Sequence, residues 1–243
     1  MKVLVTLILL FLLNAACLAQ TSIGIIANPN LNLSTIKTSS TVNTDSIKNI
    51  KKSDFTLSIG LEFRKQIDRY QAFSVIPTYY QTNLLLVQED LQLFDVIHPT
   101  LDEIRDLSQA ALKTAFMHHR FKYAGIQLLY SKAYNSSISN SLNFEFAGGL
   151  SYMYLLKQDI RVRTEGFALN DEFIHIVSDS ILFEGRKHNA VLNLGSDMNY
   201  TIKPNLKLVS GISCNIPLLA VSKNQPKLSI YNLGLKVGLR KIL

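Results

Sequence analysis

The feature that most constrains this chain is a two-residue alternation between positions 142 and 156. Even positions carry mostly bulky apolar side chains, and odd positions carry small or polar ones until Leu155 breaks the pattern. Successive side chains of a strand point to opposite faces, so the alternation predicts one long strand with an apolar face. The even set comprises Leu142, Phe144, Phe146, Gly148, Leu150, Tyr152, Tyr154 and Leu156.

Seven further segments are predicted to be strands for the same reason. The alternation is clear at 55–64, 190–202, 206–218 and 228–243. The segment at 22–33 is interrupted by Pro29, the segment at 73–86 has a mixed pattern, and the segment at 119–130 changes parity near Gly125. A β-bulge at Gly125 would restore the register of this last segment.

The connections between these segments alternate in length. Short ones lie around Asp68, at 136–140 and at 203–205, whereas long ones cover 34–54, 87–118 and 157–188. This pattern predicts an all-β fold, an eight-stranded antiparallel up-and-down transmembrane β-barrel with short periplasmic turns and long extracellular loops. In one long loop, Thr100 and Glu103 form a capping box ahead of apolar residues at helical spacing, which predicts a helix over 100–115. The alternative is that 84–93 extends the third strand above the membrane, and both remain open.

The first nineteen residues have the pattern of a secretory signal peptide. A positive start precedes an apolar run from Val3 to Leu13, which is too short to span a bilayer, and Ala19 suits the position before a cut. We therefore expect a signal peptide at 1–19 and a barrel domain at 20–243. Lipidation of Cys17 is the alternative for this leader. No later segment has the roughly 18 apolar residues of a membrane helix, so the chain is expected to enter a membrane only as a closed barrel.

Alternation alone does not decide which face of the barrel is apolar, but two observations favour the outside. The less apolar set is rich in glycine and serine, and the interior of an eight-stranded barrel is narrow. The same set carries charges that would be costly in lipid. The predicted lumen-facing polar network is Glu62, Arg64, Glu145, Asp197, Lys236 and Arg240. The alternative is a soluble periplasmic barrel with its apolar set inside, where it would bind an apolar ligand.

Two of the strands also resemble a known family. The stretch FEFAGGLSY from Phe144 to Tyr152 resembles the strand that follows the second short turn in PorT-like outer-membrane β-barrel proteins of Bacteroidetes. The ending YNLGLKVGLR, from Tyr231 to Arg240, is similar to their closing strand. The chain departs from the family in lacking a proline at 123–130 and in ending on Leu243 rather than on an aromatic residue. The resemblance implies an outer-membrane barrel, and the type IX secretion role of one family member is not carried over.

No catalytic, cofactor or metal site is predicted. His118 and His119 are adjacent and would face opposite sides of a strand, and the other histidines lack the spacing of a zinc motif. Ser151 and Ser196 are expected on opposite strand faces, and neither lies in a nucleophile-elbow sequence. Cys214 would be the only cysteine after removal of the leader, so no internal disulfide is expected.

The sequence therefore favours a small outer-membrane barrel that is not an enzyme. We expect it to act through its extracellular loops, in a structural, interaction or envelope-assembly role. Its expected partners are outer-membrane lipids, the barrel-assembly machinery and envelope proteins, but not nucleic acid, because the chain is exported. The net charge of +7 suits anionic lipid head groups, and ordinary loop charge explains it equally well. The alternative from another class is an outer-membrane lipid-modifying hydrolase with an active site at the barrel rim.

Overall fold

The computed structural model describes residues 20–37, 49–88, 114–135, 141–165, 174–176, 183–224 and 226–243. The predicted signal peptide and Cys17 lie outside these residues, as does nearly all of the predicted helix at 100–115. Within the described part, no helix is both long enough and apolar enough to cross a bilayer.

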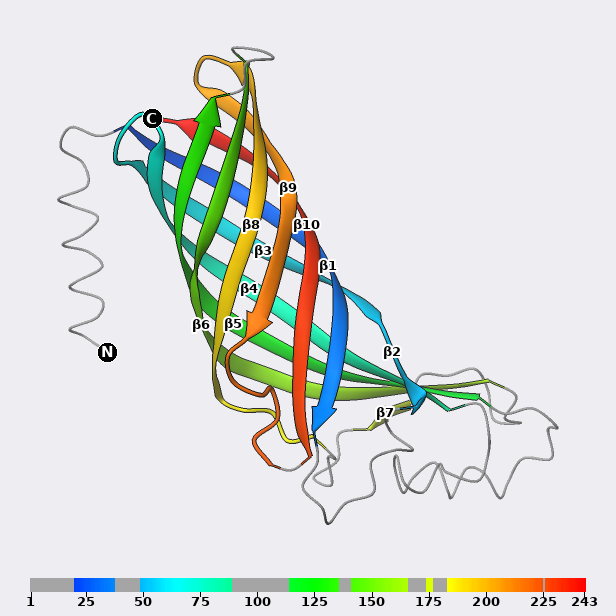
Figure 1. Ribbon diagram of the computed structural model, residues 1–243. Coiled ribbons are helices and arrows are strands. Elements are labelled where there is room, and N and C mark those ends of the chain that lie inside the picture. The colour runs from blue at the N-terminus through cyan, green and yellow to red at the C-terminus, as the bar shows by residue number, and fades with distance from the viewer. Residues whose placement is uncertain are drawn as a thin grey trace, which may run out of the picture.

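Eight strands form a closed antiparallel barrel, which confirms the predicted fold (Figure 1). Each strand pairs with the next along the wall, and the last pairs with the first. Both ends of the described barrel lie at the short-turn end, where the Leu243 amide donates to the Thr21 carbonyl at 2.9 Å. The wall strands are β1 (Thr21–Lys37), β3 (Asp54–Gln66), β4 (Gln71–Gln88), β5 (Thr114–Asn135), β6 (Leu142–Glu165), β8 (His188–Lys203), β9 (Leu206–Pro217) and β10 (Lys227–Ile242).

Three of these strands continue beyond the barrel at the long-loop end (Figure 1). The β4–β5 ladder runs without a gap to Gln88, and the β5–β6 ladder continues past one register shift to Glu165. Two short strands flank them, β2 (Lys51–Lys52) on β4 and β7 (Ile174–Ile176) on β6. We call this five-stranded extension the projecting sheet. The predicted loops at 87–118 and 157–188 are therefore strand in part, and Thr114 begins a strand rather than ending a helix.

The predicted bulge exists at a different place. Gly125 pairs in regular register with Met153, whereas the register shifts between Lys122 and Tyr123. Lys122 pairs with Lys157 and Tyr123 pairs with Leu155, so Leu156 is the extra residue. A residue inserted into a ladder inverts the parity of everything after it. Leu155 precedes the extra residue and keeps the inward parity of the odd positions, and its large aliphatic side chain packs against buried apolar residues such as Tyr123.

Pro29 does not interrupt the first strand, although it weakens one of its edges. The β1–β10 register passes from Ala27 paired with Val237 to Asn30 paired with Gly234, leaving the two residues between unpaired on that side. Proline has no amide hydrogen to donate to a ladder. On the other side, the pairing of β1 with β3 continues through Pro29.

The bulky alternating set faces outward. Phe146, Leu194 and Leu235 are 58, 46 and 60% exposed, and every wall strand has at least one exposed large apolar or aromatic side chain. Such an extensive apolar surface on a soluble protein would drive association, so the soluble barrel with an apolar interior is wrong. A closed barrel with an apolar exterior satisfies its backbone internally and can span lipid.

Candidate functional site: the polar lumen and its mouth

The six charged residues predicted to face the lumen lie inside the barrel and form three ion pairs. The Arg64 Nη1 lies 2.5 Å from the Glu145 Oε1, the Lys236 Nζ lies 2.8 Å from the Asp197 Oδ2, and the Arg240 Nε lies 2.8 Å from the Glu62 Oε2. All six are buried. They come from β3, β6, β8 and β10, because the period of two gives each of these strands an inward polar row. We call them the six-residue network, whose formal charges sum to zero.

Neutral side chains join two of these pairs. Asn199 donates from its Nδ2 to the Glu145 Oε2 at 3.0 Å and accepts at its Oδ1 from the Arg240 Nη1 at 2.9 Å. The Glu62 carboxylate also accepts from the Ser74 hydroxyl at 2.9 Å. The alternation at 190–202 puts Asn199 on the same strand face as Asp197 but does not show what it contacts, because alternation gives the face and not the partner.

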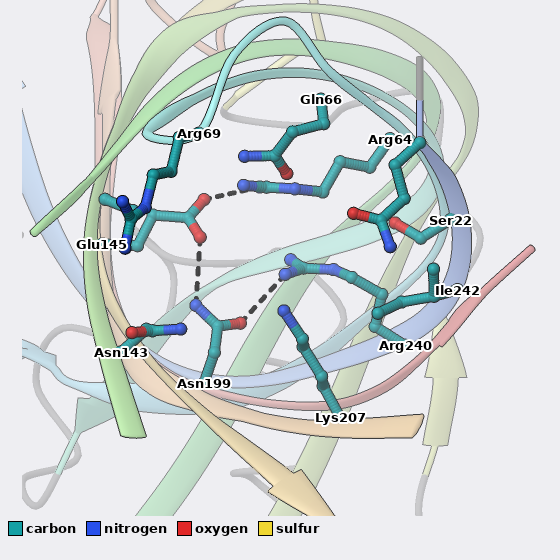
Figure 2. Close-up of a pocket in the computed structure, with 12 residues that line it drawn as sticks. Ser22, Arg64, Gln66, Arg69, Asn143, Glu145, Asn199, Lys207, Arg240 and Ile242 are labelled. Carbon is teal, nitrogen blue, oxygen red and sulfur yellow. Dashed lines mark hydrogen bonds and ion pairs between the residues drawn. The ribbon is translucent and has the colours of Figure 1, made fainter. Parts of the chain in front are cut away.

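A cavity of about 80 Å³ opens beside the network at the short-turn end (Figure 2). Two cations line it in addition to those of the network, Arg69 from the turn between β3 and β4, and Lys207 near the start of β9. Figure 2 shows Lys207 and the Arg240 guanidinium reaching into the same space from neighbouring strands. We call this cavity the mouth pocket; its lining is Gln20, Ser22, Arg64, Gln66, Arg69, Ala133, Asn143, Glu145, Asn199, Lys207, Arg240 and Ile242.

Further along the axis, amides and hydroxyls fill the lumen. Asn30 donates to the Ser58 hydroxyl at 3.0 Å, and Asn232 bridges Tyr80 and Asn32. Gly234 makes this packing possible, since a Cβ there would overlap the Asn30 amide oxygen and lie 2.9 Å from the Ser213 hydroxyl. A cavity of about 30 Å³ remains at this level, enough for water.

Large apolar side chains close the lumen at the long-loop end. The sequence predicted an interior of small and ionic groups, and this holds only for the part toward the short turns. The mixed pattern of β4 and the parity inversion at Leu156 concealed the apolar inward row. We call this cluster the apolar plug: Ile36, Tyr80, Leu84, Leu86, Met117, Phe121, Tyr123, Met153, Ile160, Phe183, Val191, Val221, Leu228 and Ile230.

A polar cluster marks the junction of the barrel and the projecting sheet. The Asp54 Oδ2 lies 3.1 Å from the His118 Nδ1 and accepts from the Asn83 amide at 2.9 Å. Burial favours the neutral form of Asp54. The hydrogen bonds from His118, Asn83 and the Phe55 amide outweigh that effect and hold the pKa of Asp54 below its ordinary value. The cluster ties β3 to β4 and β5 where the chain leaves the barrel wall.

The other candidate residues are not assembled into a reactive site. Ser151 is buried and accepts from the Asn193 amide at 2.6 Å, while Ser196 lies on the opposite strand face. His188 is the first residue of β8, and its Nδ1 lies 2.5 Å from the Tyr152 hydroxyl. Among the described residues, no group of three His, Cys, Asp or Glu side chains could hold a metal ion. His98 lies outside the described part of the chain.

Comparison with known proteins finds similar barrels at low sequence identity. Neisserial surface protein A is 12% identical with a TM-score of 0.49, over 92% of this chain and 97% of that one. The outer-membrane protein OprG from Pseudomonas aeruginosa is 8% identical with a TM-score of 0.48, over 93% and 96%. The N-terminal barrel of OprF from Pseudomonas aeruginosa is 12% identical with a TM-score of 0.40, over 92% and 99%. No protein-family model and no curated protein matches the chain.

These similarities are too weak to transfer a function. The strand pairing and the apolar exterior identify the architecture by themselves. A closed antiparallel barrel with an apolar outside, a polar interior, short turns at one end and longer connections at the other is a barrel of the outer-membrane type.

Proposed function

We propose that the protein is a small, non-enzymatic outer-membrane barrel that acts through its long-loop end, as an interaction or envelope-assembly component. The observation that carries this proposal is the filled lumen. Ion pairs occupy one end, amides occupy the middle and the apolar plug closes the other end. Eight strands enclose a space that side chains can fill, so a conducting pore is not the function supported here.

The projecting sheet supports a role at the long-loop end. β4, β5 and β6 extend past the barrel wall as one continuous sheet, and β2 and β7 add to its edges. Its inner row continues the apolar plug through Leu84, Leu86 and Met117. A sheet rooted in the barrel core offers a surface beyond the barrel wall, to which envelope proteins could bind.

The narrower assignment to the PorT-like proteins of Bacteroidetes is part of this proposal. Its support is the sequence resemblance in two wall strands, at Phe144 to Tyr152 in β6 and at Tyr231 to Arg240 in β10. Outer-membrane lipids and the assembly machinery are the partners that any such barrel requires. The role within the envelope would be that of an interaction partner.

Two measurements on the purified full chain test the proposal. A folded membrane barrel should migrate differently on a detergent gel before and after boiling, and the protein should sediment with outer membranes after cell fractionation. In planar bilayers, the folded protein should add no stepwise conductance above the protein-free membrane.

Three results would contradict it. Regular single-channel steps would show that the lumen opens. Recovery in the aqueous phase without detergent would contradict the membrane location. Covalent labelling of a residue near the long loops by a serine-reactive probe would favour the hydrolase instead.

A further inference from the structure

We propose that the mouth pocket binds a phosphate group as a tetrahedral oxyanion. The pocket carries four cationic side chains, Arg64, Arg69, Lys207 and Arg240, and one carboxylate, Glu145. Its placement on the periplasmic side rests on the proposed function, whereas the binding chemistry does not.

The pocket has more positive charge than the acidic side chains of the barrel interior balance. The three acidic and three basic groups of the six-residue network already balance. Arg69 and Lys207 add two positive charges, and in the described structure neither has an ion pair or a side-chain hydrogen bond. Arg69 makes only a cation–π contact, 5.6 Å from the Tyr70 ring centroid. A half-buried lysine beside two arginines is unfavourable unless an anion shares the site.

The one carboxylate in the pocket is already occupied. The Glu145 Oε1 contacts Arg64, and its Oε2 accepts from Asn199. Glu145 therefore leaves Lys207 without a direct partner. Both contacts of Arg64 use its Nη1, to Glu145 and to the Ser131 hydroxyl, so its Nε and Nη2 donors carry no hydrogen bond in the described structure.

The size and donor geometry fit one oxyanion. The cavity of about 80 Å³ is several times the ~10–15 Å³ that a single water requires. A planar guanidinium offers paired donors to phosphate oxygens, and a lysine adds a point charge. Asn143 and Gln20 supply neutral polar groups to the pocket lining. Free inorganic phosphate and the phosphodiester of a lipid head group share this chemistry.

Calorimetric titration of the folded full chain in maltoside micelles tests the site, because that detergent contains no phosphate. In the first arm, inorganic phosphate is titrated at low ionic strength and pH 7. In the second arm, dihexanoyl phosphatidylglycerol is titrated. At least one ligand should bind saturably at one site per chain. Binding only in the first arm identifies the free anion as the source, and binding only in the second identifies the lipid head group.

Charge-removing variants locate the site. Lys207→Gln and Arg69→Gln should each weaken binding at least tenfold, and both should fold because they leave the six-residue network intact. Lys241→Gln is the matched control, since Lys241 follows Arg240 in β10 but is exposed and outside the pocket lining. Heat-modifiability of each variant checks that it is folded.

No saturable binding in either arm would overturn the proposal, as would equal loss of binding in Lys241→Gln. A protein that fails the membrane tests but binds phosphate in the first arm would contradict the proposed function and leave this site standing.

Discussion

Arg240 uses all three of its guanidinium nitrogens for hydrogen bonds inside the lumen. It donates from its Nε and Nη2 to both oxygens of Glu62, and from its Nη1 to Asn199. Removing an ion from water costs several kcal/mol, and the attraction of a well-placed partner offsets that cost only while both partners are present. The stability of the barrel should therefore fall sharply when one partner of an ion pair is removed, and much less when both are removed.

We expect Arg240→Met to destabilise the barrel by about 3–5 kcal/mol, because it leaves the buried Glu62 carboxylate without its main partner. The double variant Arg240→Met with Glu62→Leu should recover most of that loss. The measurement is urea unfolding in phospholipid vesicles, in which the unfolded fraction is read from the loss of heat-modifiability on a detergent gel. A double variant no more stable than the single one would show that Glu62 does not depend on Arg240.

Asp54 gives a pH-dependent prediction at the junction with the projecting sheet. Its folded pKa lies below the unfolded value, so its contribution to stability is complete above the unfolded value of about 3.9 and is lost as pH falls through the folded pKa. Asp54→Asn should cost about 1–2 kcal/mol at pH 7. The difference between Asp54→Asn and the parent should shrink once the pH falls below about 4, in the same unfolding measurement. A difference that stays constant to the lowest pH would exclude an ionised Asp54 as its cause.

At the scale of elements, the bulge at Leu156 links the barrel wall to the projecting sheet. Toward the short turns, β6 has the apolar set outside, and past the bulge Ile160 is buried in the apolar plug. One inserted residue lets a single strand serve both environments, because it inverts the faces beyond it.

Deletion of Leu156 should disrupt the projecting sheet while the barrel still closes. Without the extra residue, Ile160 would leave the apolar plug. The buried Asp159 carboxylate, whose Oδ2 lies 3.3 Å from the Lys122 Nζ, would turn toward the plug and lose that partner, which is a large penalty. Limited proteolysis should cut the variant between 157 and 165 under conditions that leave the parent intact. The substitution Leu156→Ala keeps the residue count and should remain protected. Equal protection of the deletion variant would mean that the sheet tolerates either register.

At the scale of the whole molecule, the apolar exterior places the barrel in lipid. We expect Leu235→Arg, in the middle of β10 and 60% exposed, to destabilise the protein by about 2–4 kcal/mol in vesicles. Leu243→Arg, at the chain end and 68% exposed, should cost about 0–1 kcal/mol. Unfolding in vesicles measures both. Equal costs at the two positions would mean that the surface around Leu235 does not contact the hydrocarbon core.

The predictable part of the fold followed from local periodicity. A period of two assigns each side chain to a face whatever the strand pairs with, so the inward position of Arg64 and the outward position of Phe146 could both be predicted from neighbours in the sequence. The closed barrel followed from the alternation of short and long connections. Pro29 and Gly125 did not predict where the strands are irregular. A proline is tolerated where one side of a strand is unpaired, and a glycine is tolerated in a regular ladder.

Over the segments that alternate regularly, the sequence by itself determined which residues face lipid and which face the lumen, since that depends only on alternation and on the cost of a charge in hydrocarbon. The tertiary structure decided which inward residues meet. Arg64 and Glu145 are 81 positions apart and Arg240 and Glu62 are 178 apart, so their pairing depends on the stagger of the closed barrel. The mouth pocket, the bulge at Leu156 and the apolar plug depend on the same stagger, because side chains from many strands reach one level of the axis only after the barrel has closed.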